Sequence, residues 1–254
     1  MTAWKIARAC CCGTLHLTNG QPCQDELFAD ALGDAECFLG LVSDGAGSAS
    51  NGGDGASVAC GAGADIIEQW IRKAGTCSRI TPQDTTAWVE AIRQCIRTTA
   101  EEKGRHIGDF ACTLLVAIID KQAACFFQIG DGAMVVGDGD SFRPVFWPDN
   151  GEYPNATYFV TDDDALEHLH IEISSSPPDE IAMLSDGLQR MSLVYESKTA
   201  YKPFFEPMFN ALRKANESEC GILSKHMADL LNNPQVNDRT DDDKTLVLAT
   251  RRHH

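Results

Sequence analysis

Three apolar runs in this chain end in an aspartate that is followed directly by a glycine. The aspartates and the runs before them are Asp44 after residues 37–43, Asp131 after residues 126–130 and Asp186 after residues 181–185. Runs of this length, rich in Leu, Val, Ile and Phe, predict buried β-strands. The glycine after each aspartate allows the backbone to turn tightly. Such a chain therefore places carboxylates where buried strands meet solvent.

A fourth strand carries its carboxylates in the reverse order, because Asp241-Asp242-Asp243 leads directly into the apolar residues 245–249. For any single site of this kind an ordinary turn is the simpler interpretation. Four strand ends together, with Gln24-Asp25 added, favour one cluster. Clustered carboxylates repel one another and require cations. Oxygen ligands without nearby cysteine or histidine pairs favour Mg²⁺ or Mn²⁺ over zinc.

These residues follow one another as they do in a known family. In chain order the motifs are Gln24-Asp25; Val42-Ser-Asp44-Gly45-Ala-Gly47 followed by Gly55-Ala-Ser57; Ala111-Cys-Thr113-Leu; Ile129-Gly-Asp131; Leu184-Ser-Asp186-Gly187-Leu; and Asp242-Asp243-Lys-Thr245. None is rare alone, but six occur in family order over nearly the whole chain. The chain resembles the metal-dependent Ser/Thr protein phosphatases of the protein phosphatase 2C (PPM) family, bacterial type.

The order of the expected elements indicates an α+β fold. Strands, two helices, a hairpin and further strands follow one another with mostly antiparallel connections, and no linker divides the chain. The resemblance implies two stacked antiparallel β-sheets flanked by α-helices, an αββα sandwich. We therefore expect one catalytic domain over residues 1–250. We interpret residues 251–254 as a tail, in part a tag remnant.

Periodicity and capping signals predict the individual elements. Thr81-Pro82 is a good helix start, and one apolar face extends that helix to about Lys103. Residues 147–178 hold prolines and an acidic run, and predict an irregular segment with a trimmed flap. The other expected elements are strands at 4–12 and 27–30 around a loop at 13–24, helices at 56–73, 203–215 and 218–231 (the last capped by Ser218), a hairpin at 111–129, and strands at 134–136 and 142–146.

The resemblance also implies a role for each carboxylate. Asp44 would bridge two divalent ions, with the carbonyl oxygen of Gly45 as a further ligand. Asp25 would hold metal-bound water or orient the cluster, and Asp243 would support the ligands rather than bind metal. The remaining implied ligands are Asp186 and Asp242 for one ion, and Asp131 with Asp186 for a weaker third site. The expected cofactor is Mn²⁺ or Mg²⁺, as two ions with a third as an option.

Basic residues that the family uses to hold phosphate are missing from their usual places. No arginine stands shortly before Gln24, which leaves His16 or Arg8 as substitutes. His16 either contacts the phosphate or the leaving group, or is a structural histidine. Ala46 stands where eukaryotic members carry a general-acid histidine, and Gly132-Ala133 replaces a Ser-Arg pair. These departures weaken expectations about substrate affinity and leave the carboxylate cluster whole.

Net charge bears on the classes of binding partner, and cysteine content bears on the redox compartment. The formal net charge of −16 argues against nucleic acid or an anionic membrane. The longest apolar run, residues 114–119, is too short to span a membrane, and the N-terminus lacks a signal peptide's apolar core. Eleven cysteines without a Cys-x-x-Cys pair favour a reducing cytoplasm. Cys10-Cys11-Cys12 is interpreted as a buried strand segment rather than a redox or metal site.

The leading hypothesis is a cytoplasmic phosphatase that hydrolyses phosphoserine and phosphothreonine by direct attack of a water bridging two divalent metals. Its partners would be Ser/Thr-phosphorylated proteins and a cognate Ser/Thr kinase. The alternative, motivated by the missing arginines, is a metal-binding pseudophosphatase that acts as a phosphoprotein-docking or regulatory scaffold. A calcium-binding EF-hand and a P-loop enzyme are disfavoured because neither loop pattern occurs in the sequence.

Overall fold

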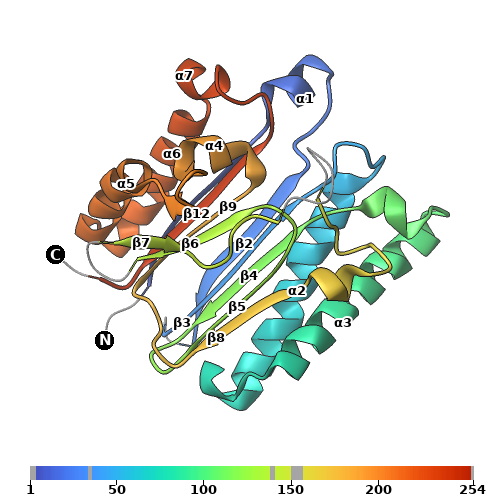
Figure 1. Ribbon diagram of the computed structural model, residues 1–254, viewed down its shortest axis with the longest axis horizontal. Coiled ribbons are helices and arrows are strands. Elements are labelled where there is room, and N and C mark those ends of the chain that lie inside the picture. The colour runs from blue at the N-terminus through green and yellow to red at the C-terminus, as the bar shows by residue number, and fades with distance from the viewer. Residues whose placement is uncertain (1–3, 34–35, 138–140, 150–156, 253–254) are drawn as a thin grey trace.

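Two five-stranded antiparallel sheets lie face to face, and helices cover the outer face of each sheet (Figure 1). The computed structural model describes residues 4–33, 36–137, 141–149 and 157–252. This arrangement confirms the α+β sandwich expected from the sequence.

The first sheet has the strand order β2-β3-β4-β5-β8. Its strands are β2 (Asp25–Leu32), β3 (Cys37–Asp44), β4 (Leu114–Ile119), β5 (Ala124–Ile129) and β8 (His170–Ser174). Strands β4 and β5 are buried along their whole length, which explains their continuous apolar sequences. The antiparallel register pairs Asp25 directly with Asp44. The start of β2 and the end of β3 therefore lie together at one end of the sheet.

The second sheet has the strand order β1-β12-β9-β6-β7. Its strands are β1 (Lys5–Cys11), β6 (Ala133–Gly137), β7 (Phe142–Pro144), β9 (Glu180–Leu184) and β12 (Lys244–Thr250), and a separate hairpin is formed by β10 (Leu193–Val194) and β11 (Thr199–Ala200). Leu246 pairs with Leu184 across β12 and β9. The acidic stretch before β12 is thereby brought to the end of β9.

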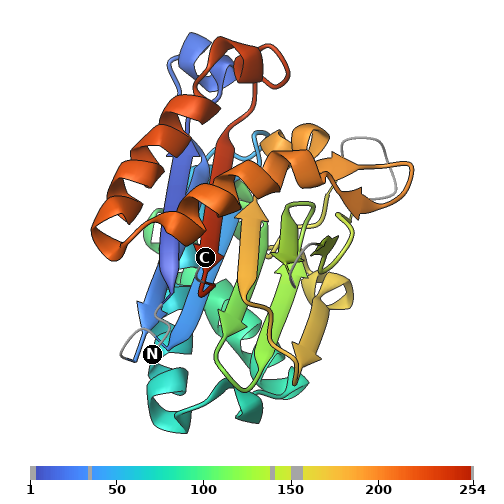
Figure 2. The same cartoon turned by 90° about the vertical axis from the view of Figure 1, so that its left-hand side faces the viewer.

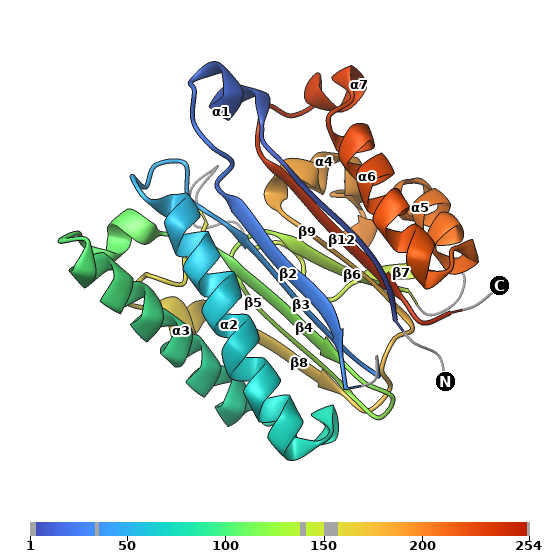
Figure 3. The same cartoon turned by 180° about the vertical axis from the view of Figure 1, so that it is seen from behind.

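Side chains from the inner faces of both sheets form the central core. Its members include Phe38, Leu115, Phe126, Met183 and Val247. Helices α2 (Gly52–Ala74) and α3 (Pro82–Glu102) cover the first sheet, as Figure 3 shows. Helices α5 (Lys202–Lys214) and α6 (Cys220–Leu231) cover the second sheet, as Figure 2 shows. Three apolar layers thus hold the two sheets in fixed positions.

Helix α3 begins as the sequence predicts. The Thr81 hydroxyl accepts a hydrogen bond from the Asp84 N–H, and the Asp84 carboxylate accepts one from the Thr81 N–H at 2.9 Å. This reciprocal capping satisfies two backbone donors at the helix start. The remaining α-helices of the described residues are α1 (Thr14–Thr18), α4 (Gln189–Ser192) and α7 (Pro234–Asn237). No helix among the described residues is long and apolar enough to cross a membrane.

Several local expectations were wrong. The expected loop at 13–24 contains α1, and α2 begins four residues earlier than expected, at Gly52. Strand β8 lies inside the segment expected to be irregular, because it adds to the edge of β5 by pairing His170 with Gln128. The expected flap falls partly on residues 150–156, which lie outside the described residues.

Two capping and burial expectations also failed. Asn216, rather than Ser218, caps the turn that leads into α6, because its side chain accepts the Glu219 N–H. In the cysteine triplet only Cys11 is buried, whereas Cys10 is exposed and Cys12 is half-buried. Alternation along β1 turns the Cys10 thiol to the opposite face from Cys11, and Cys12 lies just beyond the strand.

The first residues of the expected tail pack against the fold. The Arg251 guanidinium donates hydrogen bonds to the Asp120 carbonyl oxygen at 2.7 Å and to the Asp179 carboxylate at 2.8 Å. Arg252 forms an ion pair with the buried Glu180 at 3.4 Å. Arg251 and Arg252 therefore belong to the packed structure, while residues 253–254 lie outside the described part of the chain.

Candidate metal centre

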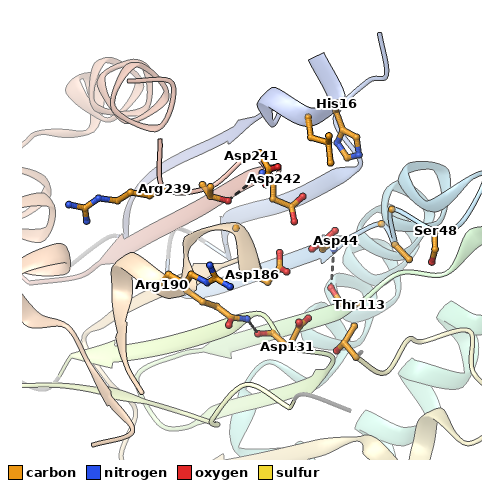
Figure 4. Close-up of a pocket in the computed structure, with 18 of the residues that line it drawn as sticks. His16, Asp44, Ser48, Thr113, Asp131, Asp186, Arg190, Arg239, Asp241 and Asp242 are labelled. Atoms are coloured by element: carbon orange, nitrogen blue, oxygen red, sulfur yellow. Dashed lines mark hydrogen bonds between the residues drawn. The ribbon is translucent and has the colours of Figure 1, made fainter. Parts of the chain in front are cut away.

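Five aspartates from five separate strand ends lie together, and four of them line one cleft (Figure 4). They are Asp25 at the start of β2, Asp44 at the end of β3, Asp131 after β5, Asp186 after β9 and Asp242 before β12. The cleft has a volume of about 1010 Å³, and four of the five aspartates line it. Figure 4 shows these four carboxylates directed toward a shared space. The structure thus brings together every carboxylate proposed as a ligand from the sequence.

Asp44 and Gly45 are held by β3, β4 and the start of α2. The Asp44 N–H donates to the Thr113 hydroxyl at 3.0 Å, and the Thr113 N–H donates to the Asp44 carbonyl oxygen at 2.8 Å. A Cβ atom at Gly45 would lie 2.3 Å from the backbone of Gly52, so only glycine fits there. The close approach of α2 explains the glycine after this aspartate.

Asp25 lies deepest in the cluster, with 7% of its surface exposed. The Ser185 hydroxyl donates to its Oδ2 at 2.7 Å, whereas its Oδ1 is buried without a hydrogen-bond partner among the described residues. Burial raises the pKa of Asp25 to about 7, and the neighbouring carboxylates add to the rise. A carboxylate in this position is stabilised by any cation that reaches Oδ1.

Three further carboxylates of the cluster, those of Asp44, Asp131 and Asp242, also have raised pKa values. Burial and the neighbouring Asp186 raise the pKa of Asp131 to about 7. The pKa of Asp44 is raised well above its usual range by burial and by Asp25 and Asp186, and the pKa of Asp242 is raised by desolvation and by Asp186. Each shift has the sign expected when negative groups share a site with too little compensating charge.

These residues fit a divalent metal. Among the described residues, no lysine or arginine forms an ion pair with any of the five carboxylates, and Asp186 Oδ1 is a second buried oxygen without a hydrogen-bond partner. The donor set is all oxygen, which suits Mg²⁺ or Mn²⁺. The arrangement therefore calls for positive charge that the protein itself does not supply.

Asp243 has a different environment from Asp242, although the two are adjacent in sequence. It is 2% exposed, and its two oxygens accept the N–H groups of Gly13 and Gln24, each at 2.6 Å. Burial raises its pKa, but these two N–H groups and His16 outweigh burial, so the pKa lies below its ordinary value. Asp243 thus ties the 13–24 segment to the start of β12 and already has partners.

His16 lies at the wall of the cleft, and Arg8 does not. His16 is 8% exposed, and its Nδ1 lies 3.0 Å from Asp243 Oδ2. The Arg8 guanidinium instead donates to the Ala29 carbonyl oxygen and is not part of the cleft lining. Of the two basic residues considered from the sequence as phosphate contacts, the structure leaves His16 as the candidate.

Reasoning from sequence alone missed a basic residue on the opposite wall. Arg190, in α4, lines the cleft (Figure 4) and forms no ion pair among the described residues. The Gln189 side chain donates to the Asp131 carbonyl oxygen and accepts from the Tyr195 hydroxyl at 2.5 Å, which anchors α4 there. Arg239 also lines the cleft, but its side chain extends away from the carboxylates in Figure 4. The only sequence signal was proximity, since Arg190 follows Asp186 by four positions.

Known proteins are similar to this chain in sequence and in fold. Residues 12–232 match the family model described as protein phosphatase 2C. The chain is 36% identical over 250 residues to serine/threonine-protein phosphatase 3 of Escherichia coli (strain K12), covering 97% of this chain and 98% of that protein.

Solved structures agree in fold. The catalytic domain of the serine/threonine protein phosphatase PstP, in complex with two manganese ions, has a TM-score of 0.65 at 15% identity, covering 97% of each chain. The serine/threonine phosphatase Stp1 from Staphylococcus aureus has a TM-score of 0.62 at 13% identity, covering 98% of this chain and 95% of that one.

At these identities the two structures establish the fold alone. The family match and the 36% identical relative, each extending over most of the chain, establish more. This chain belongs to the protein phosphatase 2C family.

Proposed function

We propose that this protein is a metal-dependent serine/threonine protein phosphatase. The observation that carries the proposal is the cluster of five aspartates, in which two buried oxygens, on Asp25 and Asp186, have no hydrogen-bond partner among the described residues. The relative from Escherichia coli, named as a serine/threonine-protein phosphatase, supports this activity. The PstP structure with manganese supports the choice of Mn²⁺, and the oxygen donors accommodate Mg²⁺ equally.

The residues that would hold the ions come from both sheets. Asp44 is central, because its charge interacts with those of Asp25, Asp186 and Asp242, and the Gly45 carbonyl oxygen would be a further ligand. Asp186 and Asp242 would bind one ion, and Asp131 with Asp186 would bind a weaker third one. When bound, two such ions supply a deprotonated water as the nucleophile and neutralise charge on the phosphoryl oxygens.

The chain's own side chains would orient the substrate and handle protons. His16 stands at the cleft wall, with Nδ1 3.0 Å from Asp243 Oδ2. We assign it a contact with the phosphate or protonation of the serine or threonine oxygen that leaves. Arg190, on the opposite wall, adds a positive charge for the phosphoryl group and takes the place of the absent family arginine. Asp25, hydrogen-bonded by Ser185, would hold water beside the ligands.

We assign phosphorylated proteins as substrates, with a Ser/Thr kinase as the enzyme that supplies them. The cleft is open to solvent and lined by polar groups, as a side chain on a protein surface requires. A cytoplasmic location is part of the proposal, and it is supported by the eleven free thiols, all within the described residues.

The deciding experiment measures hydrolysis of p-nitrophenyl phosphate and a phosphothreonine peptide with Mn²⁺, Mg²⁺ or EDTA. Wild type should turn over both substrates with metal and neither with EDTA. Asp44→Asn should lose turnover while keeping its fold by circular dichroism. Asp30→Asn, a change at an exposed position on the same sheet, should behave as wild type. Folded, metal-loaded wild type without turnover on either substrate would favour the regulatory scaffold instead.

A further inference from the structure

A second set of metal-binding atoms lies beside the aspartate cluster and has a different chemistry. Cys12, just after β1, His16, in α1, and Asp243, before β12, each place one ligand atom within 4.8 Å of the other two. His16 and Asp243 are buried, and Cys12 is half-buried. Two residues four positions apart near the N-terminus and one residue before β12 thus place a thiol, an imidazole and a carboxylate in one small volume.

The imidazole of His16 and the carboxylate of Asp243 lie close together but do not form a hydrogen bond of good geometry. His16 Nδ1 lies 3.0 Å from Asp243 Oδ2, yet Nδ1 lacks hydrogen-bond geometry to any described residue. An imidazole paired only for structural reasons would direct its N–H at the carboxylate oxygen. Two ligand atoms this close together, without a hydrogen bond of good geometry between them, can both bind one ion.

Asp243 is prepared for such a role. Its oxygens already accept the N–H groups of Gly13 and Gln24, which fix the position of the carboxylate. An ionised carboxylate has about four lone-pair sites, so each oxygen can accept an N–H and still bind a metal. Outer hydrogen bonds of this kind commonly orient metal-binding carboxylates.

The kind of ion follows from the ligand atoms. The aspartate cluster offers only oxygen, whereas this trio offers sulfur, nitrogen and oxygen, which suit Zn²⁺. Typical zinc bonds of about 2.3 Å to sulfur and about 2.0–2.2 Å to nitrogen and oxygen put ligand atoms within roughly 4 Å of one another. Small side-chain shifts in the trio reach that spacing. Three protein ligands would leave a fourth zinc position for water, and Cys12 is half-buried.

We propose that Cys12, His16 and Asp243 form a zinc site that inhibits the neighbouring centre. Zinc binding converts the Cys12 thiol to a thiolate and releases one proton. An imidazole ligated through Nδ1 keeps its proton on Nε2 and can no longer take up a second one. His16 is thereby removed from any acid–base role at the cleft. The inhibitory effect rests on the proposed phosphatase activity, but zinc binding does not.

The binding test is equilibrium dialysis of the full chain against chelator-buffered Zn²⁺ with excess Mn²⁺ present. Wild type should bind one more zinc equivalent than Cys12→Ala, and the variant's affinity at this site should fall by more than about 100-fold, beyond the loss for an outer partner. Cys10→Ala, which removes a thiol two residues earlier in β1, should bind as wild type. Asp44→Asn should also retain this zinc, because the trio lies outside the aspartate cluster. Equal zinc binding by wild type and Cys12→Ala would overturn the site.

Cobalt gives a readout that needs no variant. Co²⁺ bound through Cys12 should show thiolate-to-metal charge-transfer absorption in the near ultraviolet, and that absorption should be lost when zinc displaces it. Cobalt binding without such absorption would exclude Cys12 as a ligand.

The activity test compares zinc inhibition of Mn²⁺-dependent p-nitrophenyl phosphate hydrolysis. Cys12→Ala should keep wild-type turnover without zinc and need at least about 100-fold more zinc for half-inhibition, following its loss of affinity. Equal inhibition of the two proteins would overturn the inhibitory role. If wild type shows no turnover at all, the proposed function fails, and dialysis and cobalt absorption still decide whether the zinc site exists.

Discussion

Strand β9 has an acidic residue at each end, and the two differ in their partners. Glu180, at its start, is fully buried, and its oxygens accept hydrogen bonds from Arg213 and from the Thr250 hydroxyl, while Arg252 lies 3.4 Å away. Asp186, two residues beyond the last residue of β9, faces other carboxylates, and its Oδ1 has no partner among the described residues. One end is neutralised by the protein itself and the other is not.

The difference separates a structural acid from a functional one. A buried carboxylate costs several kcal/mol unless cations and hydrogen bonds compensate it. At Glu180 two arginines from distant segments provide that compensation. At Asp186, which is half-buried, no cation of the described residues forms an ion pair with the carboxylate, as is expected where an external cation binds. A substitution of Asp186 should therefore lower turnover, whereas a substitution of Glu180 should lower the stability of the fold.

The largest effect should come from Asp186→Asn. The amide keeps the shape of the carboxylate but removes the charge that holds a divalent ion. We expect Mn²⁺-dependent turnover to fall by about 1000-fold or more, equal to about 4 kcal/mol of transition-state stabilisation. Measured in EDTA, the melting temperature should not fall, because a repulsive charge has been removed. A variant that melts well below wild type in EDTA would contradict this account.

Glu180→Gln should lower the melting temperature and leave turnover nearly unchanged. Loss of the charge breaks the ion pair between the fully buried Glu180 and the half-buried Arg213, and breaking a buried pair costs at most about 3–5 kcal/mol. For a chain of this size each kcal/mol lowers the melting temperature by about 2–4 °C. Turnover measured well below the melting temperature should stay within a factor of two of wild type. If turnover fell as far as in Asp186→Asn, the contrast between the two ends would be wrong.

Stabilisation of the folded protein by metal should depend on Asp186 and not on Glu180. Mn²⁺ at 100 times its dissociation constant should stabilise wild type by about 2.7 kcal/mol through mass action. Glu180→Gln should gain the same amount, whereas Asp186→Asn should gain little. Thermal unfolding with Mn²⁺ and with EDTA measures all three proteins. An equal gain in Asp186→Asn would place the ion elsewhere.

The smallest effect is a pH dependence of the metal-free protein. The folded pKa values of Asp25 and Asp131 are about 7, above the ordinary value of 3.8. Between pH 4 and pH 7 the folded state therefore binds more protons than the unfolded state, so stability falls as pH rises. The slope is at most about 1.4 kcal/mol per pH unit for each carboxyl group.

Denaturant unfolding in EDTA at several pH values tests this sign. Saturating Mn²⁺ should flatten the fall, and Asp131→Asn should reduce it. Metal-free stability that rises steadily across the same range would show that the cluster is compensated in another way.

The sequence predicted the parts of the site that depend on local pattern. Apolar runs followed by aspartate and glycine marked Asp44, Asp131 and Asp186, and the structure puts all three at strand ends in one cleft. The stacked sheets followed from element order and from the family resemblance. Strand β8 was missed because its formation depends on the edge of β5 rather than on its own polar sequence.

Charge compensation could not be predicted in the same way. Nothing near Glu180 in the sequence shows that Arg213, on α5, neutralises it, and nothing near Cys12 shows that Asp243 lies beside it. Arg190 was overlooked because its position in the cleft wall depends on the hydrogen bond by which Gln189 anchors α4 to the Asp131 backbone. Each of these pairs is created by the packing of separate segments.

The sequence by itself determined where carboxylates stand on strands, because hydrophobic periodicity and glycine conformation act over a few residues. Only the tertiary structure decided which carboxylates have cations and which do not. The antiparallel register places Asp25 opposite Asp44 and brings the start of β12 to the end of β9. Electrostatic energy depends on distance in space and on burial, and both are set by how the two sheets stack.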